Sequence, residues 1–185
     1  MNSNRLHFAA LQVLLLLGGL PGPGCSRDQP PGETVVTARP FDSEVRSHFG
    51  KEFCRIAEGA ERVEVERLNA TIEEAFPPVL EPVGRPVVPS PEWAARLRAV
   101  LGDSRNYQYA KPCVPHPGVG VHFKGGPEQA TLLLCFECDM LSFAKPGEFR
   151  WRSFDPARAE LVKLAREAFP LDPVIQGLRE KRGSP

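Results

Sequence analysis

The chain has 185 residues, of which 42% are hydrophobic and 25% charged, an ordinary globular composition with enough length to bury a core. Its 23 basic and 23 acidic side chains give a formal net charge of zero. Proteins that bind nucleic acids neutralise phosphates with clustered Lys and Arg, and the sequence contains no such cluster, so we exclude a nucleic-acid partner.

The first segment, residues 1–24, has the pattern of a secretory signal peptide. Its one charged side chain is Arg5, and an apolar run follows from Phe8 to Leu20. As a helix this run would span about 20 Å, which is short of the roughly 30 Å hydrocarbon core of a bilayer. We therefore expect a signal peptide rather than a membrane span.

Small residues precede Cys25 at the third and first positions, as Gly22 and Gly24. These residues resemble the lipobox of bacterial lipoprotein precursors, with Gly22 where that family has Leu. The resemblance covers the first 25 residues and implies that Cys25 is lipidated and becomes the new N-terminus. Two acyl chains would hold the protein stably on a membrane, because each buried methylene contributes about 0.8 kcal/mol. Plain cleavage near the same bond is the alternative.

After the cleavage point, residues 25–41 are polar and rich in proline, which predicts a tether without fixed structure. We expect one folded domain over residues 42–178 and a disordered tail over 179–185. Within the domain, residues 42–57 have an apolar side with helical spacing, which places Cys54 on the opposite side of the predicted helix. Gly59 ends this helix.

The rest of the domain reads as strands and two further helices. The segment 76–89 predicts a loop with a short edge strand near Val87. Helices begin at Ser90-Pro91 and at Asp155-Pro156, and end at Gly102 and Pro170. Alternating or continuous apolar runs predict strands at 62–68, 119–123, 131–139 and 149–154. Together these elements predict an α+β fold, a small antiparallel β-meander packed by helices.

A disulfide is predicted from the hairpin that turns at residues 124–127. If the turn centres between Gly125 and Gly126, facing residues have numbers that sum to 251, so Cys113 lies opposite Cys138. Cross-strand Cβ atoms lie about 4.5 to 5.5 Å apart, close to the distance that a disulfide requires. Exported proteins also favour disulfides over free thiols. We therefore predict a Cys113–Cys138 disulfide, whereas the sequence does not decide whether Cys54 and Cys135 pair.

The same hairpin leaves other roles open for these cysteines. It brings His116 near Cys135 and Cys138, so Cys113, His116, Cys135 and Cys138 form an alternative Cys3His zinc site. Buried, inert thiols are a second alternative. A thiol redox pair of Cys135 and Cys138 is a third, although redox pairs of the thioredoxin type lie at a helix N-terminus and this pair lies in a predicted strand.

The segments Cys135-Phe136-Glu137-Cys138, Lys111-Pro112-Cys113 and Phe154-Asp155 resemble a pattern in bacterial exported proteins to which no activity is assigned. The sequence has no nucleophile elbow, zinc-hydrolase histidine pair or phosphate-binding glycine loop, so we predict no catalytic residues. We expect a lipid-anchored protein of the cell membrane or outer membrane, otherwise periplasmic or extracellular. Its expected role is that of a non-catalytic binding or structural accessory to an unknown protein or envelope ligand. A metal-binding domain is the alternative.

Overall fold

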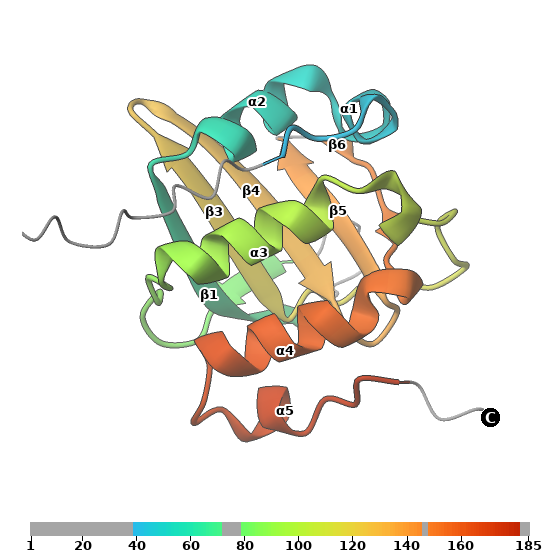
Figure 1. The fold of residues 1–185 in the computed structure, drawn as a ribbon. Coiled ribbons are helices and arrows are strands. Elements are labelled where there is room, and N and C mark those ends of the chain that lie inside the picture. The colour runs from blue at the N-terminus through green and yellow to red at the C-terminus, as the bar shows by residue number, and fades with distance from the viewer. Residues whose placement is uncertain (1–38, 72–78, 146–147, 182–185) are drawn as a thin grey trace, which may run out of the picture. The chain divides into compact units, whose positions relative to one another are not determined.

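The computed structural model describes residues 39–71, 79–145 and 148–181 of the chain. The predicted signal peptide, Cys25 and most of the predicted tether lie outside these described residues. The described part has an α+β fold, in which helices pack against an antiparallel sheet (Figure 1). This is the predicted fold class. Among the described residues, no helix is both long enough and apolar enough to cross a bilayer.

The strands of the sheet follow the order β2-β1-β3-β4-β5-β6, and β7 also pairs with β5. Every pairing is antiparallel. The strands are β1 (Arg62–Thr71), β2 (Val79–Pro82), β3 (Val119–Gly125), β4 (Glu128–Cys135), β5 (Met140–Lys145), β6 (Glu148–Phe149) and β7 (Arg152–Ser153). The successive strands β3, β4 and β5 form an antiparallel meander, as the predicted fold class requires, although β5 was not among the predicted strands.

The larger helices lie over one face of the sheet (Figure 1). They are α1 (Ser43–Phe49), α2 (Lys51–Gly59), α3 (Pro91–Leu101) and α4 (Arg158–Ala168). The short helix α5 (Pro173–Gln176) lies beside α4. As the sequence predicted, Ser90 caps α3 by accepting a hydrogen bond from the backbone N–H of Trp93. The indole of Trp93 donates to the carbonyl of Leu164 at 2.9 Å and so fixes α3 against α4.

The core lies between these helices and the inward side chains of the sheet. Alternate residues of β3 and β4 point into it, as the period of two in a strand requires. Its largest fully buried side chains include Leu97 of α3, Phe123 of β3, Leu132 of β4 and Leu161 of α4, together with Phe154, which follows β7. Burying each such side chain contributes about 1.5–3 kcal/mol.

The predicted helix over residues 42–57 is in fact two helices. Gly50 has a φ of 91°, a left-handed value that glycine adopts readily, and it separates α1 from α2. The change of direction also corrects the prediction for Cys54, which is fully buried in the core. A single continuous helix over residues 42–57 would place this thiol on the side away from the core.

Two predicted strands also differ from the structure. The strand predicted over 131–139 ends at Cys135 because residues 136–139 form a turn, in which Asp139 has a φ of 53°. The chain reverses its direction in this turn and continues as β5, a strand that was not predicted from the sequence. The strand predicted over 149–154 is divided between β6 and β7.

The predicted ends of the domain need small corrections. Phe41, assigned to the tether, is a core residue that is only 4% exposed. At the other end, the carbonyl of Arg179 accepts a hydrogen bond from Arg158, and Arg166 forms an ion pair with Glu180 at 3.4 Å. The first residues of the predicted disordered tail are therefore held against α4.

Candidate functional site

The structure joins Cys113 to Cys138 in a disulfide, with Cα atoms 6.1 Å apart. Cys113 lies in the segment that precedes β3, and Cys138 lies in the turn between β4 and β5. The hairpin register differs from the predicted one, since Gly125 faces Glu128 and facing residues sum to 253. The bond forms all the same because the two-residue shift keeps both segments at the same end of the hairpin.

The other two described cysteines, Cys54 and Cys135, are free and buried thiols. Burial raises the pKa of Cys54 to about 11 and also raises the pKa of Cys135. The Cys135 sulfur accepts a hydrogen bond from the backbone N–H of His116 at 3.3 Å. Since the thiolate is the reactive form of cysteine, burial leaves both thiols weakly nucleophilic.

The zinc alternative does not fit this arrangement. Zinc binds cysteine as a thiolate, and the disulfide leaves neither Cys113 nor Cys138 in that form. The imidazole of His116 lies 3.5 Å from the carboxylate of Glu137. Within residues 39–71, 79–145 and 148–181, no group of three or more His, Cys, Asp or Glu side chains is arranged to hold a metal ion.

A buried ion pair lies next to the disulfide. Asp139 is fully buried and pairs with Arg158 of α4, which is 8% exposed. The Arg158 guanidinium also donates to the carbonyl oxygens of Phe136 and Arg179, each at 2.9 Å. Arg158 thereby joins the β4–β5 turn to α4 and to the C-terminal segment.

A hollow of about 350 Å³ opens beside this ion pair and is lined in part by Asp139, Asp155 and Arg158. Lys111 pairs with Asp155 and lies 3.8 Å from the Asp139 carboxylate. Because these opposite charges already satisfy one another, the hollow offers a ligand little uncompensated charge. We interpret this cluster as structural.

A second polar group crosses the sheet at His122. Its Nε2 lies 2.6 Å from a carboxylate oxygen of Glu66, and its Nδ1 lies 2.9 Å from the hydroxyl of Thr131. Serine-hydrolase triads also place an imidazole between a hydroxyl and a carboxylate, but there Nε2 contacts the hydroxyl and Nδ1 the carboxylate, the reverse of the contacts of His122. Here, however, Thr131 faces His122 directly across β3 and β4, and Glu66 is its diagonal neighbour on β1. Such cross-strand contacts stabilise a sheet, so we interpret this group as structural.

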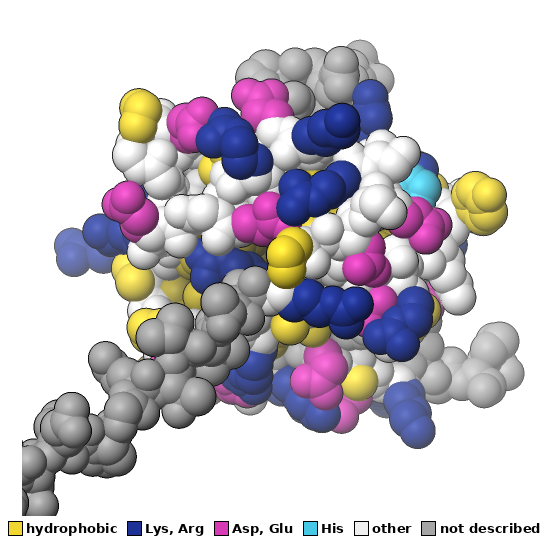
Figure 2. Space-filling view, turned by 45° about the horizontal axis from the view of Figure 1, so that its top comes forward, with side chains coloured by type: hydrophobic (Ala, Val, Ile, Leu, Met, Phe, Trp, Pro, Cys, Tyr) yellow, Lys and Arg dark blue, Asp and Glu magenta, His cyan; other side chains and the backbone are white. Residues whose placement is uncertain are grey.

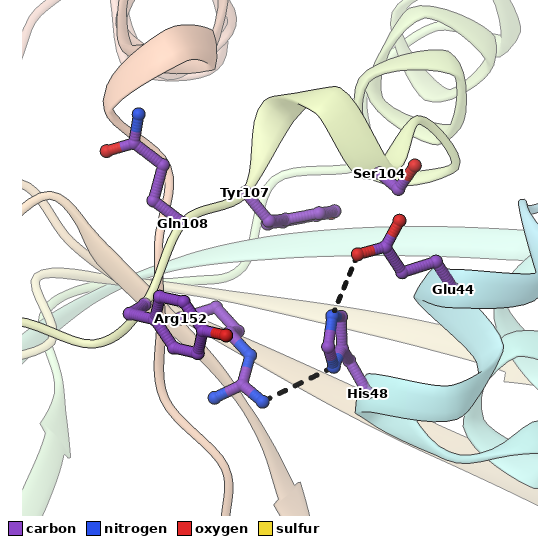
Figure 3. A pocket seen from close by; sticks show the side chains of 7 residues that line it. Glu44, His48, Ser104, Tyr107, Gln108 and Arg152 are labelled. Atoms are coloured by element: carbon purple, nitrogen blue, oxygen red, sulfur yellow. Dashed lines mark hydrogen bonds and ion pairs between the residues drawn. The ribbon is translucent and has the colours of Figure 1, made fainter.

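The third polar group lines a pocket of about 140 Å³, shown in Figure 3. Three parts of the chain form it: helix α1, the segment 104–109 and strand β7. We call it the Arg152 pocket. Its lining residues are Glu44, His48, Ser104, Tyr107, Gln108, Tyr109 and Arg152.

Packing and backbone hydrogen bonds fix the walls of the Arg152 pocket. The Tyr107 ring packs edge-on against Phe49, with centroids 5.0 Å apart, and its hydroxyl donates to the carbonyl of Leu101 at 2.8 Å. Burial raises the pKa of Tyr107 well above its usual value, so this hydroxyl stays protonated. The backbones of Gln108 and Ser153 exchange two hydrogen bonds, which hold the segment 104–109 beside β7.

His48 lies between the two charged side chains of the pocket (Figure 3). A guanidinium nitrogen of Arg152 donates to Nδ1 of His48 at 3.3 Å. Arginine has no acceptor, so this contact is a hydrogen bond in the tautomer whose Nδ1 carries no proton. Nε2 in turn lies 3.5 Å from the carboxylate of Glu44. The imidazole therefore holds a cation and an anion apart.

The Arg152 pocket is not among the sites predicted from the sequence. Glu44 and His48 are four residues apart on a helix, a spacing that indicates contact between their side chains. Arg152 lies 104 residues beyond His48, so no local spacing relates it to the other two. Comparison of the chain with protein-family models, curated protein sequences and solved structures found no match.

Proposed function

We propose that this chain is an exported, lipid-anchored protein of the cell envelope, and that its α+β domain serves there as a binding or structural accessory. The observation that carries the proposal is the Cys113–Cys138 disulfide. Disulfides form and persist in oxidising compartments such as the periplasm and the extracellular space, and cytosolic thiols are kept reduced. A second support is the sequence of residues 1–25, with its apolar run and the small residues before Cys25.

The position of Cys113 strengthens the argument from the disulfide. Cys113 is exposed whereas Cys138 is buried, so a reductant can approach this bond from the Cys113 side without unfolding of the domain. An accessible disulfide of this kind would be short-lived in a compartment rich in reduced glutathione. An oxidising compartment therefore suits this chain better than the cytosol.

Surface charge bears on the kind of partner. In the view of Figure 2, Lys and Arg side chains alternate with Asp and Glu side chains instead of gathering in one patch. Several charges on the surface of the described residues are paired, as in Arg55 with Glu128 at 2.6 Å and Arg96 with Glu167. Paired charges release few counterions on contact with a polyanion, which favours a small ligand or a protein over a nucleic acid.

The proposal is tested by the intact mass of the protein from its native membrane fraction, measured under denaturing, non-reducing conditions with and without alkylation. We expect a chain that begins at Cys25, carries acyl groups, is two hydrogens light for one disulfide, and has two alkylatable thiols. An unmodified chain with four alkylatable thiols besides Cys25 would contradict both the anchor and the disulfide.

A variant experiment separates the anchor from the fold. Cys25→Ser should move the protein from the detergent-extracted to the soluble fraction. Cys54→Ala, which removes another cysteine outside the lipobox, is the matched control and should leave the protein in the membrane fraction. Membrane retention of Cys25→Ser would contradict lipid anchoring through this residue.

A further inference from the structure

We infer that the Arg152 pocket binds a small zwitterion, with its carboxylate on Arg152 and its ammonium group on Glu44. The ligand class is a free α-amino acid, or the α-amino-acid end of a larger molecule. This inference deepens the binding role proposed above and rests on it. It depends on the free hydrogen-bonding capacity of Arg152, the place of Glu44 and the size of the pocket.

Arg152 provides the site for the carboxylate. Its guanidinium donates to the carbonyl of Trp151 at 3.1 Å and to His48 at 3.3 Å, and neither acceptor carries a negative charge. Within the described residues no carboxylate forms an ion pair with Arg152. A guanidinium has five N–H groups in a planar fork that matches a carboxylate, so unused donors remain for a bidentate contact.

Glu44 provides the site for the ammonium group. Its side chain is 66% exposed, and its contact in the pocket is the Nε2 side of the His48 ring. Figure 3 shows the Glu44 carboxylate and the Arg152 guanidinium at opposite ring nitrogens of His48. The two charges cannot neutralise each other by direct contact while the imidazole stands between them. A ligand whose ammonium and carboxylate groups are attached to the same carbon atom can contact both.

Pocket size limits the part of the ligand that is enclosed. An apolar cavity of about 150 Å³ holds benzene, which has six carbon atoms. The Arg152 pocket has about 140 Å³, and glycine has five non-hydrogen atoms, so an α-amino-acid group fills it. Tyr109 also lines the pocket and is 91% exposed, so a larger ligand can extend over this ring towards solvent.

The test is a titration of the full-length protein, prepared with Cys25→Ser, followed by NMR shifts of the backbone amides of residues 104–109 and Ser153. The probes are glycine, which carries both charges, acetate, which carries only the carboxylate, and methylammonium, which carries only the cation. We expect glycine to bind at least about fivefold more tightly than either single-charge probe, because it alone makes both charge-assisted contacts.

Two variants assign the two contacts. Arg152→Gln and Glu44→Gln should each weaken glycine binding by about fivefold to tenfold, since each removes one of the two charge-assisted contacts at a partly exposed site. The matched control is Lys163→Gln, which removes an exposed charge on α4 away from the pocket. Thermal unfolding of Glu44→Gln, an exposed position, should match that of the parent and so exclude misfolding as the cause.

Three results would overturn the inference: acetate binding as tightly as glycine, glycine binding that survives both variants, or no shift at residues 104–109 with any probe. The first would leave an anion site, and the last would leave no ligand site in this pocket. None of these results bears on export or lipidation, which the mass and fractionation experiments decide separately.

Discussion

The Cys113–Cys138 disulfide gives the most quantitative prediction. The two cysteines are 25 residues apart in sequence. In the chain-entropy model, the bond removes about 2.1 + 1.5R ln 25, or about 12 cal/mol/K, from the unfolded ensemble. At 25 °C this entropy corresponds to about 3.5 kcal/mol. The double variant Cys113→Ser/Cys138→Ser should therefore lose about 3.5 kcal/mol of unfolding free energy.

The measurement is urea unfolding of the oxidised protein, the reduced protein and the double variant, with thermal unfolding as a second readout. A loss of this size lowers Tm by roughly 10 °C in a chain of this length. Reduced wild-type protein is the control, because it also lacks the bond but keeps both sulfur atoms, and it should unfold close to the double variant. If both forms unfold within about 1 kcal/mol of the oxidised protein, then the bond does not constrain the unfolded chain as argued.

Three further predictions concern the core. Asp139→Asn keeps a side chain that tolerates positive φ but removes the negative charge that pairs with the buried Arg158. Urea unfolding should therefore show a loss of about 3–5 kcal/mol in the free energy of unfolding. A loss below about 1 kcal/mol would mean that water solvates the pair. Gly102→Ala places a Cβ 2.8 Å from the Phe41 ring and should cost about 1–3 kcal/mol, whereas an unchanged Tm would show that Phe41 moves freely. Burial raises the pKa of Cys54 from 9.0 to about 11, so the folded state favours the neutral thiol. The contribution of Cys54 to the free energy of unfolding should therefore be complete below pH 9 and should decrease between pH 9 and 11. Cys54→Ala should show a smaller fall over that range, and an identical fall would assign the effect to other groups.

Local signals predicted the fold class well. The alternation in β1 and β3 and the Ser90 cap of α3 depend on residues close together in sequence, and the structure contains all three elements. Helical spacing failed at Cys54 because it assumes one continuous helix. The signal that could have corrected it was Gly50, since glycine is the residue that most readily adopts the positive φ found there.

The register of the β3–β4 hairpin shows a finer limit. The sequence Gly125-Gly126-Pro127 permits more than one turn centre, and the structure places Gly126 and Pro127 at the two turn positions, with a φ of 56° at Gly126. Glycine at the first central position is what a type II′ hairpin turn requires. Choosing the turn type before the centre would have given the correct register.

The polar clusters could not be predicted in the same way. Asp139 falls at the end of the strand predicted over 131–139, but its partner Arg158 comes from a helix that is distant in sequence. Similarly, Arg152 reaches His48 only because β7 and α1 meet in the folded domain. Contacts of this kind depend on tertiary packing, which leaves no periodic pattern in the sequence.

The Arg152 pocket takes its walls from α1, from the segment 104–109 and from β7, so only the folded domain possesses it. Folding and occupancy are therefore thermodynamically linked, and a ligand at ten times its Kd adds about 1.4 kcal/mol to the free energy of unfolding. A chain that crosses a membrane unfolded carries no bound ligand with it. If the chain is exported as proposed, a zwitterion in the Arg152 pocket would come from the compartment in which the domain folds, and its concentration there would add to the stability of the newly folded protein.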